Sequence, residues 1–297
     1  MRKDPTNRVY AMTRLALYNR VAERSASLVI RGYSTSFGMA SRILNKDSMR
    51  HIDNVYALVR LADEIVDGVA VEAGLTIAQA GRYLDELEAD TYSAMATGYS
   101  TNLIVHAFAL TAREVNIQKD IVEPFFTSMR MDLTDRVYTK ESFDTYVYGS
   151  AEVVGLMCLA VFVRDDKPDA DTARTLYNGA RALGAAFQKV NFLRDLAADV
   201  DELGRSYFPG VTIATFTEDD KHRLCDDISE DLDAAARTIP LLPRDAARAV
   251  GLAHGLFARL NSRIRQTPAE KLKSSRIRVN DVEKLLIAAR VIARGGK

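Results

Sequence analysis

Hydrophobic residues recur at intervals of three and four positions along most of the chain. That interval places them on one side of an α-helix, so the sequence predicts amphipathic helices that bury this side. The strict alternation of hydrophobic and polar residues that predicts β-strands does not occur. We expect helices over about residues 9–31, 48–69, 75–97, 101–116, 119–133, 140–163, 169–203, 218–237, 243–266 and 279–294. The fold class that this pattern predicts is all-α.

The breaks between these helices are short. Helix starts are indicated at Asn45 to Asp47, Thr76, Thr139 and Asn280, because Asn, Asp and Thr side chains accept hydrogen bonds from the first free amides of a helix. The chain has only 16 Gly and 7 Pro, which favours long helices. No Gly/Ser-rich linker, repeat of fixed period or change in composition divides it. We therefore expect a single domain over residues 1–297.

The composition narrows the class of protein. Hydrophobic residues make up 47% of the chain and charged residues 27%, as in globular proteins with a sizeable core. Lys and Arg together number 40, and so do Asp and Glu. This zero net charge argues against a nucleic-acid partner. The two cysteines, Cys158 and Cys225, indicate neither a disulfide framework nor a metal site.

The sequence shows no membrane span or secretory signal. The first residues lack the apolar core of a signal peptide. The longest nearly uniform apolar run, Val153 to Val163, is too short to cross a bilayer. We therefore expect a cytoplasmic protein. These patterns leave open a peripheral attachment to the inner face of the membrane.

Two acidic residues, Asp63 and Asp67, lie four positions apart near the end of the second predicted helix. This spacing puts both carboxylates on one face of the helix. Tyr56 and Arg60 precede them at helical steps and extend the same polar face, while the opposite face is apolar. An ordinary solvated face mixes Lys and Glu. The short carboxylates, phenol and guanidinium found here favour a binding site.

A second polar face follows in the seventh predicted helix, where Gln188, Asn191, Asp195 and Asp199 recur at steps of three and four. A single acidic pair is most often plain exposed surface, but two matched faces favour a shared cleft. Mg²⁺ uses few protein carboxylates and completes its shell with phosphate oxygens. The two faces therefore predict a magnesium site that ionises a diphosphate. The expected metal ligands are Asp63, Asp67, Asp195 and Asp199, with Asn191 as a ligand or as a hydrogen-bond donor to a diphosphate oxygen.

Segments spread over nearly the whole chain from residue 33 resemble, in order and spacing, motifs of the squalene/phytoene synthase family of head-to-head prenyl transferases. They are Tyr-Ser-Thr-Ser-Phe (33–37), the first acidic motif (56–67), Met-Asp-Leu (131–133) with Tyr138, the segment 146–155, the second acidic motif (188–199) with Gly-Arg-Ser-Tyr-Phe-Pro (204–209), and Arg-Ile-Arg-Val (276–279). The chain departs from the family pattern at Val137, Ser150, Ala198 and Phe257. None of these is an expected metal ligand.

The resemblance implies an isoprenoid-synthase-type helical bundle around a central cavity. It also implies an Mg²⁺-dependent enzyme, with Mn²⁺ as a substitute, that joins two allylic prenyl diphosphates through a cyclopropyl diphosphate. The Asp-Glu-Ile-Val-Asp form of the first motif (63–67) is common in phytoene synthases. We therefore expect two geranylgeranyl diphosphates to give phytoene, a carotenoid precursor, without NADPH.

Roles for the other candidate residues follow from this chemistry. Arginine side chains are expected to bind free phosphate oxygens, and hydroxyl or amide groups to donate hydrogen bonds to the same anion. The candidates are Arg60, Arg205 and Arg276, with Ser34, Ser36, Tyr56, Gln188 and Tyr207. We count Arg60 and Tyr56 with the four aspartates as catalytic. Carbocations need a dry wall without nucleophiles. The candidates for it are Phe37, Tyr146, Val154, Gly155 and Phe187, although apolar residues at helical spacing are usually plain core.

Other functions remain open from the sequence. A dehydrosqualene or squalene synthase would use two farnesyl diphosphates, and squalene formation would require NADPH. A non-catalytic helical assembly factor of the same fold should have lost some of the aspartates. A terpene cyclase or head-to-tail enzyme usually shows an Asp-Asp-x-x-Asp arrangement, which this chain lacks. The expected partners are a prenyl diphosphate and, for release of an apolar product, a membrane surface. The oligomeric state stays open.

Overall fold

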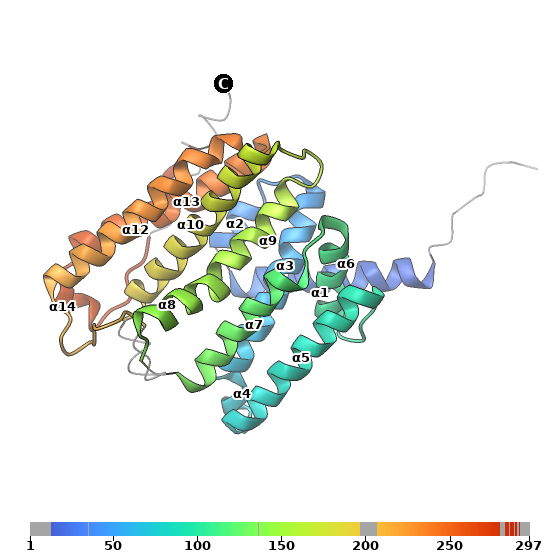
Figure 1. The fold of residues 1–297 in the computed structure, drawn as a ribbon, viewed down its shortest axis with the longest axis horizontal. Coiled ribbons are helices and arrows are strands. Elements are labelled where there is room, and N and C mark those ends of the chain that lie inside the picture. Colours follow the sequence, from blue (N-terminus) through green and yellow to red (C-terminus); the bar gives the residue numbers. More distant parts are fainter. Residues whose placement is uncertain are drawn as a thin grey trace, which may run out of the picture.

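The computed structural model describes residues 13–34, 36–135, 137–196 and 207–279, and residues 283, 284, 286, 287, 289 and 291 near the C-terminus. These residues form a bundle of helices and contain no β-strand (Figure 1). The longer helices are α1 (Arg14–Tyr33), α3 (Lys46–Val66), α5 (Ile77–Thr97), α6 (Leu103–Val115), α7 (Lys119–Thr134), α8 (Lys140–Val147), α9 (Val153–Phe162), α10 (Ala170–Arg194), α12 (Glu218–Thr238) and α13 (Arg244–Gln266). The shorter elements are α2 (Ser36–Ser41), α4 (Val69–Glu72), the π-helical turn η1 (Tyr148–Glu152), the 3₁₀ turn η2 (Ile239–Leu241) and α14 (Ala269–Leu272). The all-α prediction is confirmed.

The predicted helix starts are formed by the expected side chains. Asn45 accepts a hydrogen bond from the Ser48 amide at 2.9 Å and so caps α3. Thr76 and Thr139 each form a reciprocal capping box with the residue three positions on. The short elements α2, α4, η2 and α14 were not predicted, because a single turn offers too few positions to show a period. The helix expected over 279–294, with its start at Asn280, lies mostly outside the described residues.

Two apolar cores organise the bundle. One lies among α3, α5, α6, α7 and α9 and contains the fully buried rings of Phe108, Phe125 and Phe126. The other lies among α8, α10, α12 and α13 and contains Phe192 and Phe208. Figure 1 shows α8 and α9 crossing the middle of the bundle, with α10, α12 and α13 on one side and α5, α6 and α7 on the other. The central segment α8–η1–α9 therefore joins the two cores.

This central segment runs continuously from Lys140 to Phe162. These 23 residues, whose most apolar 18-residue window has a mean hydropathy of 1.5, are the one stretch among the described residues that could cross a membrane by length and composition. The expectation from the sequence considered only its most apolar part and judged it too short. In the fold the segment packs on α7 and α10, and 44% of its most apolar window is buried. A core helix of a globular bundle has the same properties.

Candidate active site

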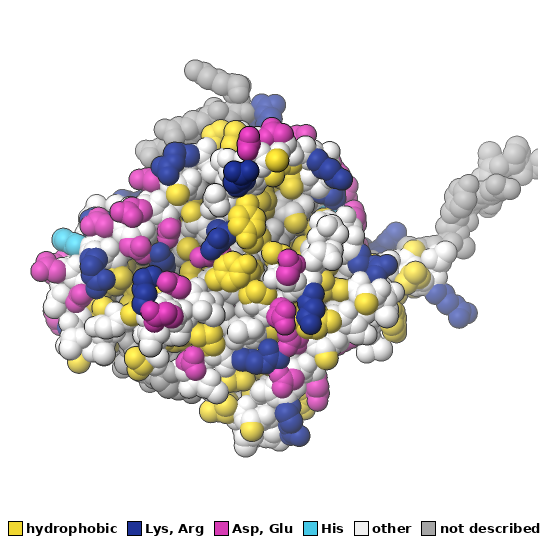
Figure 2. Space-filling view, viewed as in Figure 1, with side chains coloured by type: hydrophobic (Ala, Val, Ile, Leu, Met, Phe, Trp, Pro, Cys, Tyr) yellow, Lys and Arg dark blue, Asp and Glu magenta, His cyan; other side chains and the backbone are white. Residues whose placement is uncertain are grey.

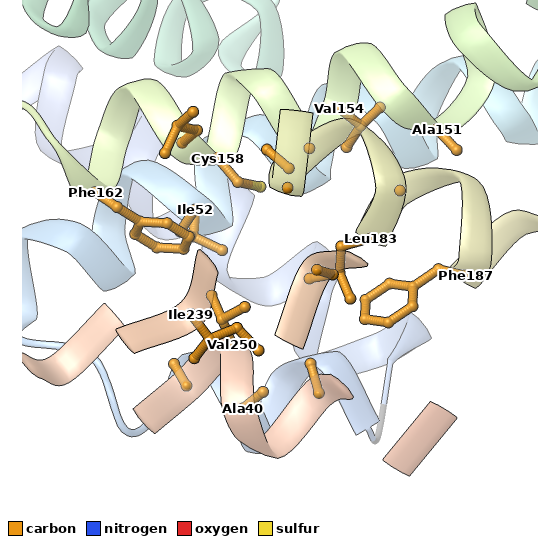
Figure 3. A pocket seen from close by; sticks show the side chains of 18 of the residues that line it. Ala40, Ile52, Ala151, Val154, Cys158, Phe162, Leu183, Phe187, Ile239 and Val250 are labelled. Carbon is orange, nitrogen blue, oxygen red and sulfur yellow. The ribbon is translucent and has the colours of Figure 1, made fainter. Parts of the chain in front are cut away.

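An apolar cavity of about 260 Å³ lies between the helices. Figure 3 shows Val154, Cys158 and Phe162 of α9 along one wall, facing Leu183 of α10 and Val250 of α13. The polar residues in its lining are few: Ser41, Ser150, Gln188, Asn191 and Thr238. A concave site of this composition is suited to a hydrocarbon chain, with a small number of polar groups to fix one end.

The side of helix α10 that faces the cavity changes from apolar to polar to acidic residues along its length. Leu183, Phe187, Asn191 and Asp195 are each four residues apart and so lie on one side of the helix. The first three line the cavity, and Asp195 follows at the end of the helix. At 1.5 Å per residue, about 18 Å separates Leu183 from Asp195 along the axis. The side of α10 thus passes from apolar wall, through an amide, to a carboxylate.

Helix α3 repeats this arrangement. Ile52 and Val59 line the cavity, and Asp63 and Asp67 follow toward the end of the helix. The two acidic ends are linked through Asp132 of α7, whose charge acts on Asp63. Asp132 also accepts a hydrogen bond from Tyr207 at 3.3 Å, and the Tyr207 ring stacks on Phe192, the residue after Asn191. Asp132 and Tyr207 therefore connect the acidic end of α3 with the last turn of α10, beyond the end of the cavity lining.

Both helices end earlier than the sequence predicted. Helix α3 stops at Val66 and not at 69, because Gly68 adopts φ 116, a left-handed conformation that glycine tolerates. The described part of α10 stops at Arg194, although a helix to 203 was expected. Asp67 and Asp195 are the C-terminal caps, with φ/ψ of −93/14 and −102/12 degrees. The predicted helix bounds are thus too long at these two ends, although the Asp67 amide still donates to the Asp63 carbonyl at 2.8 Å.

These positions place carboxylates at the ends of helices, where unpaired backbone carbonyls already concentrate negative charge. The pKa of Asp63 lies well above its usual range, mainly because the carboxyl group is buried and also because Asp67 is close. Asp67 itself is exposed. A cation between these groups would remove the repulsion. The electrostatics therefore favour a bound cation at this end of the site.

Arg60 is held beside Asp63 by two neighbours. Its guanidinium forms an ion pair with Glu64 one turn further on, and lies over the ring of Tyr33 with 4.5 Å to the centroid. Its Nε atom is buried without a hydrogen-bond partner. Arg60 therefore has a donor to offer to an anion. We expected no ligand role for Glu64, and its place in the structure is that of a partner that orients Arg60.

Ser34 and Tyr56 come together where α1 ends beside α3. Their side chains share a hydrogen bond, and burial raises the pKa of the Tyr56 hydroxyl. Tyr56 is therefore a neutral donor at the physiological pH range, as the expected contact to an anion requires. Ser34 is the C-terminal cap of α1. The side chains of Ser36 and Phe37, also expected in the site, lie outside the described part of the chain.

The end of α10 brings arginine side chains onto Asp195. Arg276 Nε lies 2.8 Å from Asp195 Oδ1, so the structure joins two of the predicted site residues. Arg194 Nε lies 3.0 Å from the same oxygen. Asn191 Oδ1 is buried and has no hydrogen-bond partner. Asp199 and Arg205, which were predicted to complete this end, lie outside the described residues.

Tyr146 and Tyr207 occupy different positions from those expected. Neither belongs to the cavity lining; both are buried in an aromatic cluster with Phe192. Their hydroxyl groups point to Asp132, at 2.8 Å from Tyr146 and 3.3 Å from Tyr207. Tyr146 thus contacts the acidic end of the site through its hydrogen bond to Asp132. Its ring does not line the cavity.

Val154, Gly155 and Phe187 lie in the cavity lining, where they were expected, and so does Gln188. Gly155 has a second role that the sequence did not reveal. A Cβ atom added there would lie 2.5 Å from the carbonyl oxygen of Ala180. Gly155 is therefore required for the close approach of α9 to α10, and the room that it leaves in the cavity is secondary. Phe187 stacks on Phe257 with 3.8 Å between ring centroids.

Two residues of the site were not assigned a role from the sequence. Asp132 was noticed only as part of a motif, although a buried acidic residue within an apolar helix is a signal of function or of a special partner. Arg194 gave no signal, because its contact with Asp195 depends on where α10 ends. Helix ends are the least certain feature of a sequence-based prediction.

The residues present are suited to a magnesium ion. The unpaired Asn191 Oδ1 and the carboxylates at both helix ends are oxygen ligands, which Mg²⁺ prefers. Among the described residues no three acidic, His or Cys side chains are close enough to hold a metal on their own. Coordination at these residues would therefore draw on substrate oxygens as well, which is the usual behaviour of Mg²⁺ at phosphate sites.

Comparison with known proteins identifies the family. A model of the squalene/phytoene synthase family matches residues 30–283. The chain belongs to this family. Its members are prenyltransferases, and the resemblance noted from the sequence motifs is confirmed.

Individual members of the family differ in how much they share with this chain. The chloroplastic phytoene synthase of an Oncidium hybrid cultivar is 32% identical over 194 residues, which cover 60% of this chain and 41% of that protein. The phytoene synthase of Mycobacterium tuberculosis is 27% identical over 293 residues, covering 92% of this chain and 91% of that protein. The match thus spans less than half the length of the plant relative and nearly all of the bacterial one.

Solved structures support the fold. A dehydrosqualene synthase crystallised with a ligand superposes with a TM-score of 0.77, at 20% sequence identity, over 94% of this chain and 98% of that chain. The agreement extends over both cores and the central segment, since nearly the whole chain is matched. The isoprenoid-synthase-type helical bundle is therefore the fold of this chain.

Proposed function

We propose that this member of the family is an Mg²⁺-dependent prenyltransferase that joins two geranylgeranyl diphosphates head to head into phytoene. The observation that supports it most is that α3 and α10 both change from apolar residues to carboxylates toward their C-terminal ends. Each helix lines an apolar cavity and then ends in carboxylates. A molecule with a long hydrocarbon chain and a diphosphate at one end fits this order, with the chain in the apolar cavity and the diphosphate at the carboxylates.

The diphosphate would lie between the two acidic helix ends. Bound Mg²⁺, for which Mn²⁺ could substitute, would act there as a Lewis acid for the departing anion. Asp63, Asp67 and Asp195 would hold the metal, with Asn191 Oδ1 as a further oxygen. Arg60, through its unpaired Nε, and Arg276 would bind phosphate oxygens. Tyr56 would donate a hydrogen bond to the same anion.

The hydrocarbon chains would occupy the cavity. Most of its lining consists of side chains such as Val154, Leu183 and Phe187, which offer no nucleophile to a carbocation and exclude water. Cys158 also lines the cavity, but burial raises the pKa of its thiol to about 12, so the reactive thiolate does not form. In the first half-reaction one diphosphate leaves, the double bond of the second substrate attacks the allylic cation, and loss of a proton from the resulting cation closes the ring of a cyclopropyl diphosphate. In the second, this intermediate loses its diphosphate, rearranges and loses a proton. No reductant enters this balance, so no NADPH is required.

The choice of the C20 substrate rests on the relatives. Those most similar in sequence include phytoene synthases from a plant and from Mycobacterium tuberculosis, and the first acidic motif has the form common in such enzymes. We further propose that the protein acts in the cytoplasm as part of carotenoid biosynthesis. A C15 substrate, giving dehydrosqualene or squalene, and a non-catalytic role are the alternatives that the experiment must separate.

The test is product analysis with purified protein. Geranylgeranyl and farnesyl diphosphate are supplied separately with Mg²⁺, each with and without NADPH, and the extracted hydrocarbon is identified by mass spectrometry. We expect phytoene from the C20 substrate in equal yield with and without NADPH. Efficient C30 formation without any C40 product would contradict the substrate assignment but not the reaction class. Absence of hydrocarbon from both substrates would favour the non-catalytic role.

A further inference from the structure

Helix α1 exposes most of its larger apolar side chains, and two of its three buried residues are alanines. Its buried positions are Ala22, Ala26 and Ile30. Leu17, Val21 and Leu28 have exposed fractions of 50%, 42% and 66%. In a helix that only packs on a protein core, the larger apolar residues face the core. In α1 only Ile30 among the larger apolar residues is fully buried, while Leu17, Val21 and Leu28 stay exposed, which indicates an apolar partner outside the bundle.

Leu17, Val21 and Leu28 share one side of α1 with arginines, whereas the exposed Leu15 and Tyr33 lie on another side of the helix. At 100° per residue, Leu17, Val21 and Leu28 fall within about 40° of one another around the axis. Arg20, Arg24 and Arg31 are exposed and follow along one margin of this stripe. No described acidic side chain forms an ion pair with Arg20 or Arg24. We refer to these six residues as the outer face of α1.

Polar contacts on the two flanks between the outer face and the buried side fix the orientation of α1. The Tyr18 hydroxyl donates to the Ser100 carbonyl at 2.8 Å, and the Ser27 hydroxyl donates to Asp53 at 2.6 Å. Glu23 pairs with Arg50 of α3 at 2.6 Å. Rotating α1 to bury Leu17 or Leu28 would break all of these contacts. These contacts therefore keep the outer face of α1 exposed on the protein surface.

The charge of this part of the chain differs from that of the whole. Residues 1–34 contain seven Lys and Arg and two Asp and Glu, whereas the complete chain has 40 of each class. The positive excess is thus concentrated at one end and is balanced by a negative excess elsewhere. Figure 1 shows the N-terminal end of α1 extending past the bundle, and Figure 2 shows basic and hydrophobic side chains on this projecting end.

We infer that the outer face of α1 docks the protein on a bilayer that contains anionic lipids. An apolar stripe bordered by arginines is the pattern of a helix lying in the interface, with its apolar side among the acyl chains and its cations at the headgroups. A second copy of the chain fits less well, because pairing two outer faces would bring their arginines together. The inference rests on α1 alone and does not depend on the proposed reaction.

The first experiment measures sedimentation of the purified full chain with vesicles, in the absence of substrate. Vesicles of phosphatidylcholine alone are compared with vesicles that also contain phosphatidylglycerol. We expect binding to the anionic vesicles that weakens as salt is added. The variant Arg20→Gln/Arg24→Gln should bind about 25-fold more weakly, at about fivefold per arginine. The variant Leu17→Ser/Val21→Ser/Leu28→Ser should bind at least about tenfold more weakly.

Matched control variants alter exposed residues elsewhere. Val71→Ser/Ile77→Ser/Leu241→Ser removes three apolar side chains of similar exposure, and Arg174→Gln/Arg223→Gln removes two exposed arginines. Both controls should bind as the parent does. Equal losses in the control and α1 variants would overturn the inference, as would binding that ignores the anionic lipid.

A second experiment uses the absence of tryptophan from the chain. The variant Leu28→Trp carries a single fluorophore on the outer face, and Ile77→Trp carries one on α5. With anionic vesicles the emission of the Leu28→Trp protein should shift to shorter wavelength, and that of Ile77→Trp should not. If the Leu28→Trp emission instead shifts with protein concentration alone, and light scattering shows a dimer that the triple serine variant lacks, the face joins two copies and the inference is wrong.

Discussion

The Tyr146 hydroxyl donates a 2.8 Å hydrogen bond to Oδ2 of Asp132 in the interior of the bundle. Both residues are buried, with exposed fractions of 3%. Burial and the adjacent carboxylate raise the pKa of Tyr146 well above its usual range, so the phenol stays protonated and remains a donor. Asp132 in turn lies close enough to Asp63 to act on its charge. This hydrogen bond therefore fixes the position of the Asp132 carboxylate near Asp63 at the acidic end of the site.

Replacing Tyr146 by Phe should destabilise the protein. The change removes a donor from a buried charged acceptor, which typically costs about 1.5–3 kcal/mol of unfolding free energy. Urea unfolding followed by circular dichroism gives the value. Tyr83→Phe serves as the control, since Tyr83 is half-exposed and its change should be within about 0.5 kcal/mol. Equal effects in the two variants would show that the Asp132 contact contributes nothing specific.

Replacing Asp63 by Asn should abolish turnover and weaken metal binding. The carboxylate is a proposed ligand, and its removal leaves Asp67 without the neighbour with which it would share the ion. Binding of Mn²⁺ in the presence of inorganic diphosphate, followed by electron paramagnetic resonance, provides a readout separate from activity. Asp144→Asn is the control, because Asp144 only pairs with Lys140 at the surface. Normal metal binding in the Asp63 variant would exclude this residue from the metal site.

Narrowing the deep end of the cavity should change the length of the product. Cys158 of α9 lines the cavity one turn beyond Val154, away from Phe187 (Figure 3). A Phe at this position would fill space that only the longer chain reaches. We expect Cys158→Phe to lose most activity with the C20 diphosphate while keeping activity with the C15 diphosphate. Cys158→Ala, which leaves the space open, should behave as the parent does. Unchanged C40 formation in the Phe variant would place the chains elsewhere.

The pH dependence of stability should reflect two buried histidines. Burial lowers the pKa of His51 and of His106 below the usual 6.5, and the charge of Arg50 adds to the effect at His51. Below pH 6.5 the unfolded chain therefore binds protons that the folded chain does not. Stability should fall as the pH drops from 6.5, by up to about 1.4 kcal/mol per pH unit for each histidine, until the folded pKa is reached.

The measurement compares unfolding free energies at pH 6.5 and 5.5 for the parent and for His51→Gln/His106→Gln. The double variant should show a smaller loss. His222→Gln is the control, because His222 is a half-exposed histidine at the surface. A double variant that loses as much stability as the parent would assign the acid sensitivity to other groups.

The sequence predicted most of the fold because the long helices have a clear hydrophobic period and conventional caps. Thr76 and Thr139 show this, since each was expected to begin a helix and each forms a capping box. The π-helical turn η1 escaped prediction, because the hydrophobic pattern continues through it. It brings Gly149 so close to α7 that a Cβ atom there would lie 2.1 Å from the Pro124 carbonyl oxygen. Such close contacts between distant segments leave no local pattern.

The candidate site was predicted where residues share one helix, and less well where it depends on long-range contacts. The pair Asp63 and Asp67 and the series through Asn191 to Asp195 follow from spacing alone. The contact of Arg276 with Asp195 joins residues 81 positions apart, and the motif resemblance located Arg276 but not its partner. Tyr207 was expected on a diphosphate, and the structure places its hydroxyl on Asp132. Direction of a side chain in a loop cannot be inferred from spacing.

The most direct test of the central claim is the stoichiometry of the reaction. Purified protein is incubated with geranylgeranyl diphosphate and Mg²⁺, and the released diphosphate and the hydrocarbon are quantified in the same sample. Head-to-head condensation at the two acidic helix ends predicts two diphosphates for each C40 hydrocarbon, with neither product formed in excess chelator. A ratio of one, or diphosphate released without any C40 hydrocarbon, would contradict the account.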